Sequence, residues 1–233
     1  LGGSDEDAAY GVNIDSKGRI FITGGTLSND FQVTNNAYDK TYNGQIDGFV
    51  TELNSSGSSI LASTYIGTSS YDQSYLIQFD AFDHVYITGQ TKGVMPVVGD
   101  VYSNSNGRQF ISMFDDNLTS LLKSTVFGSG SKEPDLSPSA FLVDLCGRIY
   151  VSGWGGGVNE FYNGNISSTK GLPVTNDAFQ KSTDGSDFYL IILDKYFNSL
   201  IYGSYFGGPK SEEHVDGGTS RFDRNGIVYQ SVC

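Results

Sequence analysis

Acidic side chains gather at two places in the sequence where a hard cation could bind. Asp5-Glu6-Asp7 lies near the start of the chain, and Glu212-Glu213 precedes Asp216 near its end. Calcium takes about six to eight oxygen ligands, which carboxylates and backbone carbonyl groups supply. Because no D-x-D-x-D-G loop occurs, the sequence favours a solvated acidic rim over a bound ion. The alternative is a calcium site, with no other cofactor, formed by Asp5, Asp7, Glu213 and Asp216.

A long aromatic segment is the second candidate site. Trp154–Thr169 reads WGGGVNEFYNGNISST and holds the only tryptophan of the chain and three successive glycines. Exposed aromatic side chains on a long loop commonly contact sugars or proteins. The segment therefore predicts a ligand-binding surface formed by Trp154, Phe161 and Tyr162. The alternative, which the sequence supports equally, is a loop that packs its rings against the protein.

The two histidines do not combine with other residues into a catalytic or metal site. His84 and His214 lack metal-ligand spacing with each other and with either cysteine. His214 could act as a general base, but no serine or cysteine nucleophile can be paired with it, and G-x-S-x-G does not occur. The sequence thus predicts no catalytic residues and a protein that is not an enzyme. A hydrolase or lyase is the least favoured function.

Internal repeats indicate which elements position these residues. The first anchor is a short motif present in four copies: GRIFITG (Gly18–Gly24), DHVYITG (Asp83–Gly89), GRIYVSG (Gly147–Gly153) and GIVYQSV (Gly226–Val232). The second anchor also occurs four times: Leu1-Gly2-Gly3, Tyr65-Ile66-Gly67, Val126-Phe127-Gly128 and Tyr205-Phe206-Gly207. A third anchor pairs Phe31–Leu53 with Leu172–Leu193. Anchors that recur in one order indicate duplicated supersecondary units.

One repeat contains four short runs typical of β-strands. In the first full copy they are Ala8–Asp15, Arg19–Thr23, Asp47–Leu53 and Ser59–Ile66. The first two runs are joined by a turn in which an Asp caps the backbone and a Gly three residues later takes positive φ. That aspartate recurs in every copy, which indicates turn formation rather than chemistry: Asp15, Asp80, Asp144 and Asp223. Asp47 and Asp187 recur where third strands begin, and we expect them to bond backbone across neighbouring strands or blades.

Four antiparallel strands repeated in tandem predict an all-β fold, a β-propeller built of four-stranded blades. The expected blades form an incomplete set of about three and a half: 1–3 as the tail of a preceding blade, then 4–67, 68–128, 129–207 with a long inserted loop, and 208–233 as the first half of a further blade. A β-solenoid is the structural alternative. Almost no helix is expected, because no sustained helical period occurs. Trp154–Lys170 is expected to project from its blade.

The composition argues against several classes of partner. With 38% hydrophobic and 17% charged residues, the chain can bury a core. The formal net charge of −12 disfavours nucleic acid, because phosphate contacts need Lys and Arg. No apolar run reaches the roughly 18 residues that membrane insertion requires. Cys146 and Cys233 do not make a disulfide framework and are not expected to pair, while Cys233 is a candidate for pairing outside the given residues.

The anchors resemble the SBBP repeats, named for a seven-bladed β-propeller, of large Bacteroidetes surface proteins. The family pattern has an Asp in the first hairpin, then G-x-[IV]-[YF]-[IV]-[TS]-G, F-P-x-T-x-x-A-[FY], D-[AG]-F-V and Y-[LIF]-G-G. The matching residues of the first copy are Asp15, Gly18–Gly24, Phe31–Tyr38, Asp47–Val50 and Tyr65–Gly67. The second copy departs most from the pattern, since Arg108 occupies the place of Asp47.

The later copies resemble a narrower group within this family. Cys146–Gly156 and Glu213–Asp223 are similar to repeats of very large proteins that carry PKD-type modules and a type B signal for the type 9 secretion system, often described as gliding-motility-associated. The resemblance implies export across the outer membrane and an extracellular place on the cell surface. It offers no catalytic residues to carry over.

The expected function is that of a non-enzymatic structural or adhesive propeller module of a large secreted protein, linked to surface adhesion or gliding motility. The alternative is a carbohydrate-binding or calcium-dependent recognition propeller. The expected partners are a protein or glycan at the cell surface, other modules of the same polypeptide, and the type 9 secretion machinery during export.

Overall fold

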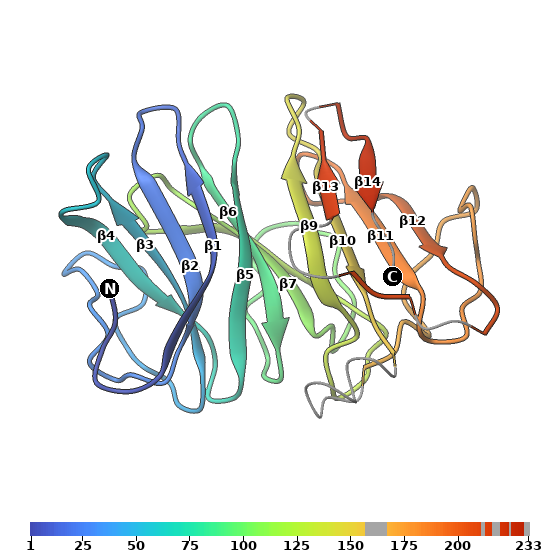
Figure 1. Ribbon diagram of the computed structural model, residues 1–233, viewed down its shortest axis with the longest axis horizontal. Coiled ribbons are helices and arrows are strands. Elements are labelled where there is room, and N and C mark those ends of the chain that lie inside the picture. Colours follow the sequence, from blue (N-terminus) through green and yellow to red (C-terminus); the bar gives the residue numbers. More distant parts are fainter. Residues whose placement is uncertain (157–166, 211–212, 216–219, 224, 231–233) are drawn as a thin grey trace. The chain divides into compact units, whose positions relative to one another are not determined.

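A computed structural model describes residues 1–156, 167–210, 213–215, 220–223 and 225–230 (Figure 1). The chain divides into two compact units: Leu1–Gly99 with Phe110–Thr125, and Asp100–Gln109 with Val126–Cys233. The described residues contain strands and turns but no helix, which confirms the prediction of an all-β fold. None of them forms a helix long and apolar enough to cross a membrane.

Three four-stranded antiparallel sheets follow one another along the chain, and each keeps its strands in sequence order. The first sheet has β1 (Asp7–Ile14), β2 (Ile20–Thr26), β3 (Asp47–Leu53) and β4 (Ile60–Ile66). The second has β5 (Asp72–Phe79), β6 (Val85–Thr91), β7 (Gln109–Phe114) and β8 (Leu121–Phe127). The third has β9 (Ser137–Val143), β10 (Ile149–Trp154), β11 (Phe188–Leu193) and β12 (Leu200–Phe206). A hairpin of β13 (Ser220–Phe222) and β14 (Val228–Gln230) comes last.

The turn that joins the first two strands of each repeat is built as its sequence predicts. Oδ1 of Asp15 accepts the backbone N–H groups of Lys17 and Arg19, at 3.0 and 2.8 Å. Gly18 takes a φ of 79°, a left-handed conformation that glycine adopts without steric cost. The same two bonds, to the second and fourth residues on, recur at the equivalent aspartates: Asp80, Asp144 and Asp223. Asp83 replaces the glycine in the second copy and still reaches a φ of 62°.

The glycine that closes the first anchor is required by a bulge in the neighbouring strand. The β1–β2 register shifts between Ala9 and Gly11, and this irregularity brings the carbonyl oxygen of Ala8 against Gly24. A Cβ atom at Gly24 would overlap that oxygen. The second sheet repeats the arrangement, with the carbonyl oxygen of Gln73 against Gly89. Only glycine fits at this position in the first two copies of the motif.

The long connection between β2 and β3 packs along the outer strand of its own sheet. Thr34 N–H donates to Ser63 O at 3.0 Å, and Phe31 packs on Phe49 with ring centroids 4.5 Å apart. The hydroxyl of Tyr65 donates to the backbone oxygen of Ser28 at 2.8 Å. The third repeat makes the equivalent bond from Thr175 N–H to Gly203 O, and the Tyr205 hydroxyl donates to Leu172 O in the same connection. The F-x-V-T and L-P-V-T anchors therefore fasten these connections to the sheets.

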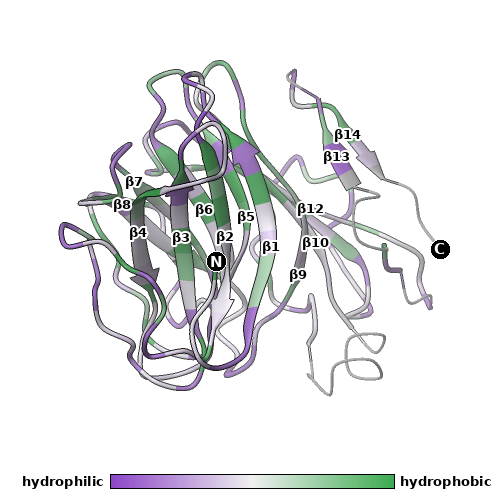
Figure 2. Cartoon of the chain, turned by 60° about the vertical axis from the view of Figure 1, so that its left-hand side comes forward, coloured by the Kyte–Doolittle hydropathy of each residue, from purple (hydrophilic) through white to green (hydrophobic). Residues whose placement is uncertain are grey.

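The core of the first unit consists of large side chains from the inner faces of its strands. Phe21, Phe110 and Ile87 have no exposed surface. Figure 2 shows hydrophobic residues along the strands and hydrophilic residues in many of the turns. β5 lies beside β1 and β2, so the first strands of successive sheets are neighbours in this unit. The Asn13 amide nitrogen donates to Ile77 O at 3.2 Å across this contact.

Candidate functional site

An acidic side chain closes the loop that leads into each successive sheet. We call this loop, from the last strand of one repeat to the first strand of the next, a junction. In every junction a backbone N–H donates to a carboxylate four to six residues later. The pairs and distances are Gly3 to Asp7 at 2.7 Å, Thr68 to Asp72 at 2.6 Å, Ser129 to Asp135 at 2.9 Å, and Gly208 to Glu213 at 2.7 Å. Two of the acidic residues predicted from the sequence, Asp7 and Glu213, occupy this position.

The predicted calcium ligands do not lie together among the described residues. Asp7 is half-buried and accepts hydrogen bonds from the hydroxyl groups of Thr26 and Ser28. Asp5 is exposed, and its Oδ1 accepts the neighbouring backbone N–H of Glu6 at 2.9 Å. Glu213 belongs to the second unit, and Asp216 lies outside the described residues. Within the described part of the chain, no group of three or more His, Cys, Asp or Glu could hold a metal ion.

A more deeply buried pair of carboxyl groups stands at the junction between the first two sheets. Asp47, at the start of β3, and Asp72, at the start of β5, are both fully buried. Asn43 donates its backbone N–H to Oδ2 of Asp47 at 2.7 Å, and Thr68 donates its hydroxyl to Oδ2 of Asp72 at 2.8 Å. Burial raises the pKa of Asp47 to about 7, the Asn43 bond opposes this shift, and the charge of Asp72 adds to it.

Glycine at the junction makes room for the two carboxyl groups. A Cβ atom at Gly67 would lie 2.8 Å from Oδ1 of Asp47 and 3.3 Å from Oδ2 of Asp72. Both carboxyl groups therefore point at the same backbone position. The sequence predicts that Asp47 bonds backbone across strands. Its Oδ2 does accept a backbone N–H, but its Oδ1 is buried with no hydrogen-bond partner among the described residues.

The aromatic site predicted at Trp154, Phe161 and Tyr162 is described only at its first residue. Trp154 is the last residue of β10, opposite Phe188 and Ser137 in the sheet, and is half-buried. Its ring packs on His214, with centroids 5.8 Å apart. Phe161 and Tyr162 lie outside the described residues, as does most of the loop expected to project from the third repeat.

The remaining residues with possible chemistry are spread through the fold. His84 lies in a turn, where its Nδ1 is 2.8 Å from Oδ2 of Asp80. The Asp80 side chain also accepts the N–H groups of that turn, so this pair belongs to the hairpin. Cys146 is a free, exposed thiol in the corresponding turn of the third repeat. Cys233 lies outside the described residues.

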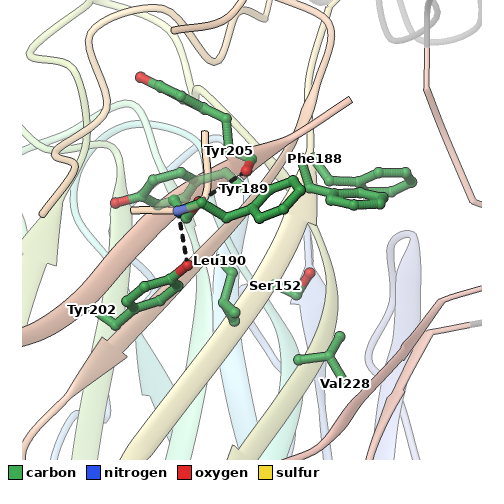
Figure 3. Close-up of a pocket in the computed structure, with 10 residues that line it drawn as sticks. Ser152, Phe188, Tyr189, Leu190, Tyr202, Tyr205 and Val228 are labelled. Atoms are coloured by element: carbon green, nitrogen blue, oxygen red, sulfur yellow. Dashed lines mark hydrogen bonds between the residues drawn. The ribbon is translucent and has the colours of Figure 1, made fainter. Parts of the chain in front are cut away.

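An aromatic pocket in the second unit is the largest departure from the sites expected from sequence. Its volume is about 330 Å³, and β10, β11, β12 and β14 contribute to its lining (Figure 3). Phe179 and Phe206 are 76% and 55% exposed, with ring centroids 5.8 Å apart. The backbone N–H of Phe179 donates to the Tyr202 hydroxyl at 3.1 Å, the bond drawn in Figure 3. Leu190 and Ser152 also line the pocket.

A sequence signal for this pocket exists in β12. Its sequence, LIYGSYF, alternates so that Tyr202, Ser204 and Phe206 share one face of the sheet. Ile66 stands at the corresponding position of the first repeat and is 1% exposed, whereas Phe206 is largely exposed. A large aromatic residue at an equivalent but uncovered position distinguishes the third sheet from the first.

Comparison of the sequence with protein-family models and with curated proteins gives no match.

Proposed function

We propose that the repeated sheets are blades of a β-propeller, and that the chain is a non-enzymatic structural and adhesive module of a large secreted cell-surface protein. The observation that carries this proposal is the use made of the recurring polar residues. In each repeat the hairpin aspartate accepts the same two turn N–H groups, and the junction carboxylate accepts the same loop N–H. Polar groups that repeat with every sheet serve the fold, since a reaction needs its catalytic group only once.

The propeller assignment is supported by the arrangement inside the first unit. Successive blades of a propeller pack around an axis, with their first strands innermost. β1 and β5 are neighbours here, and a Cβ atom at Gly11 would lie 2.8 Å from the carbonyl oxygen of Tyr75. Rings at the two bulges, Tyr10 and Tyr75, stand 5.0 Å apart. Close approach of successive first strands is the packing that a propeller requires.

The cell-surface part of the proposal depends on the resemblance of the anchors to SBBP repeats. It includes export by the type 9 secretion route, contact with other modules of the same polypeptide, and a role in adhesion or gliding. An antibody raised against the 233-residue chain should label intact source cells. It should fail to label cells whose type 9 secretion is blocked. Labelling that requires cell lysis in both strains would contradict surface display.

Carbohydrate recognition is the second candidate function, and the aromatic pocket favours it. Exposed rings with a polar partner are suited to the apolar faces and hydroxyl groups of sugars. Phe179 and Phe206 provide the rings, and Tyr202 provides a hydroxyl. A glycan array should show binding that Phe206→Ala abolishes. Phe82→Ala is the matched control, because Phe82 is 79% exposed but lies in a turn of the first unit. Equal binding by both variants would exclude the pocket.

A further inference from the structure

The position that begins the third strand differs among the three sheets in the charge that it carries. The Thr23 hydroxyl donates to Phe49 O, and the Thr88 hydroxyl donates to Phe110 O, so these two strand residues are equivalent. Two residues before them stand Asp47 in the first repeat and Arg108 in the second. In the third repeat, Gly153 pairs with Tyr189 as Gly24 pairs with Phe49, and the corresponding position is Asp187. The series is acidic, basic, acidic.

The basic member of the series faces a buried carboxylate. Asp135 is 2% exposed and accepts the backbone N–H of Ser129. Burial raises the pKa of Asp135, while bonds from Ser129 and Ser131 and the positive charge of Arg108 act in the opposite direction. Arg108 Nε donates to Ser131 O at 3.3 Å, which holds the guanidinium beside this loop. This junction therefore carries its own compensating cation.

The first acidic member faces a carboxylate instead. The charges that act on Asp47 come from Asp72 and Asp39, and both are negative. Oδ1 of Asp47 has no hydrogen-bond partner among the described residues, although the side chain is fully buried. It points at Gly67, the position that the Asp72 carboxylate also approaches. Two buried carboxylates with no nearby positive charge are costly, so a proton or a cation must compensate them.

The third repeat reproduces this geometry. Asp187 is fully buried, and its Oδ1 is likewise without a hydrogen-bond donor among the described residues. Oδ1 of Asp187 and Oε2 of Glu213 converge on Gly207, as the first pair converges on Gly67. Burial raises the pKa of Asp187, a hydrogen bond with Thr183 opposes this shift, and the nearby charges of Asp184 and Glu213 add to it. The junctions before β5 and after β12 thus each present a pair of carboxyl groups, whereas the junction between β8 and β9 presents one carboxyl group and an arginine.

We propose that each of these two junctions binds one calcium ion, between Asp47 and Asp72 and between Asp187 and Glu213. The ion supplies the positive charge that the Arg108 guanidinium supplies at the junction between β8 and β9. Calcium prefers carboxylate oxygens, and two carboxylates provide up to about four of its six to eight ligands. Backbone carbonyl or water oxygens complete the shell. Of the ligands expected from the sequence, only Glu213 belongs to this set, and Asp5, Asp7 and Asp216 do not. The proposal does not depend on the adhesive function proposed above.

The test uses the full 233-residue chain after dialysis against a chelator. Isothermal titration with CaCl2 at pH 7.5 should give two ions bound per chain, and calcium should raise the Tm by several degrees. Asp47→Asn should lose one of the two ions, and the double variant Asp47→Asn/Asp187→Asn should lose both. Asp5→Asn changes an exposed carboxylate that belongs to neither pair; it is the control and should still bind two.

Asp47→Arg copies the charge of the middle junction and gives a second measurement. This variant should bind one ion fewer, and its Tm in chelator should be at least that of the wild-type chain. If Asp47→Arg does not fold, the asparagine variants still decide the question. The proposal is wrong if millimolar calcium does not bind to the wild-type chain, or if both asparagine variants retain two ions. If the chain does not bind calcium but its Tm rises as the pH is lowered, each pair shares a proton instead of a calcium ion.

Discussion

The guanidinium of Arg19 reaches Glu52 on β3, with Nη1 2.6 Å from Oε1. Its Nε lies 2.6 Å from Oδ2 of Asp15, the aspartate of the first hairpin. The side chains of both acidic residues are almost fully buried, and that of Arg19 is 16% exposed. Burial raises the pKa of Glu52, although Arg19 acts to lower it. Arg19 and its two acidic partners thus form a largely buried ion-pair network. Removal of one member would leave an uncompensated buried charge, which lowers stability.

Arg19→Met should therefore destabilise the protein strongly. Loss of one partner from a buried ion pair costs about 3–5 kcal/mol, because the other charge stays buried. Urea denaturation measures the difference in the free energy of unfolding. Arg148→Met is the matched control, since Arg148 holds the same motif position in the third repeat but is exposed. It should change stability by less than about 1 kcal/mol. Equal losses in the two variants would contradict the network at Arg19.

Gly89→Ala should lower stability by more than the usual cost of losing a glycine. The new Cβ would overlap the carbonyl oxygen of Gln73 and lie 2.7 Å from the Phe110 ring. Overpacking of this kind costs about 1–3 kcal/mol or more, because backbone must move. Gly18→Ala separates steric overlap from backbone strain, since Gly18 has φ 79° and no atom near the Cβ position. The free energy of unfolding of Gly18→Ala should fall by only about 1–2 kcal/mol, the cost of left-handed backbone for alanine. A smaller loss at Gly89 than at Gly18 would contradict the bulge explanation.

Asp144→Ala should destabilise the first hairpin of the third repeat. Oδ1 of Asp144 accepts the N–H groups of Cys146 and Arg148, both at 2.8 Å, and Oδ2 accepts the Tyr150 hydroxyl. Each lost bond is worth about 0.5–1.5 kcal/mol, so thermal unfolding should show a total loss of about 1.5–4.5 kcal/mol in the free energy of unfolding. Asp144→Asn keeps an acceptor oxygen and should retain most of the stability. If Asp144→Asn and Asp144→Ala lose the same stability, the negative charge of Asp144 stabilises the hairpin rather than its hydrogen bonds to the turn.

In the presence of a chelator, the first junction should make stability fall as pH rises from about 4 to 8. The folded pKa of Asp47 is about 7, above the unfolded value of about 3.9. Between these values the folded state binds more protons, so the free energy of unfolding decreases with increasing pH. The loss should be at most about 4 kcal/mol, because a difference of one between the folded and unfolded pKa is worth about 1.4 kcal/mol. Urea titrations across this range should give a flatter profile for Asp47→Asn. If the free energy of unfolding of Asp47→Asn depends on pH as steeply as that of the wild-type chain, a group other than Asp47 is responsible for the titration.

The strands and first turns could be predicted from sequence because local rules determine them. The four runs of the first repeat lie within three residues of β1–β4 at every boundary, and the second strand continues past Gly24 to Thr26. The hairpin aspartates accept backbone N–H groups two and four residues along the chain. Short-range geometry of this kind is encoded in a few neighbouring residues, so repetition of the motif was enough to reveal it.

The candidate site was harder to predict because its residues meet through packing between strands. Asp47 and Asp72 are in different repeats, and only the junction at Gly67 brings their carboxyl groups together. Runs of acidic residues such as Asp5-Glu6-Asp7 are more conspicuous in the sequence, yet the structure leaves them partly solvated. The exposure of Phe206 depends on whether a neighbouring element covers β12. Sequence periodicity predicts which face of a sheet a residue occupies, but it does not predict whether another element packs on that face.

Deletion of the gene segment that encodes these repeats is the most direct test of the cell-surface function. The rest of the polypeptide would be kept in frame, and attachment and spreading of the cells would be measured together with secreted hydrolytic activities. The account predicts weaker attachment or slower spreading, with the hydrolytic activities unchanged. Normal attachment and spreading, accompanied by loss of a hydrolytic activity, would contradict it and favour an enzyme.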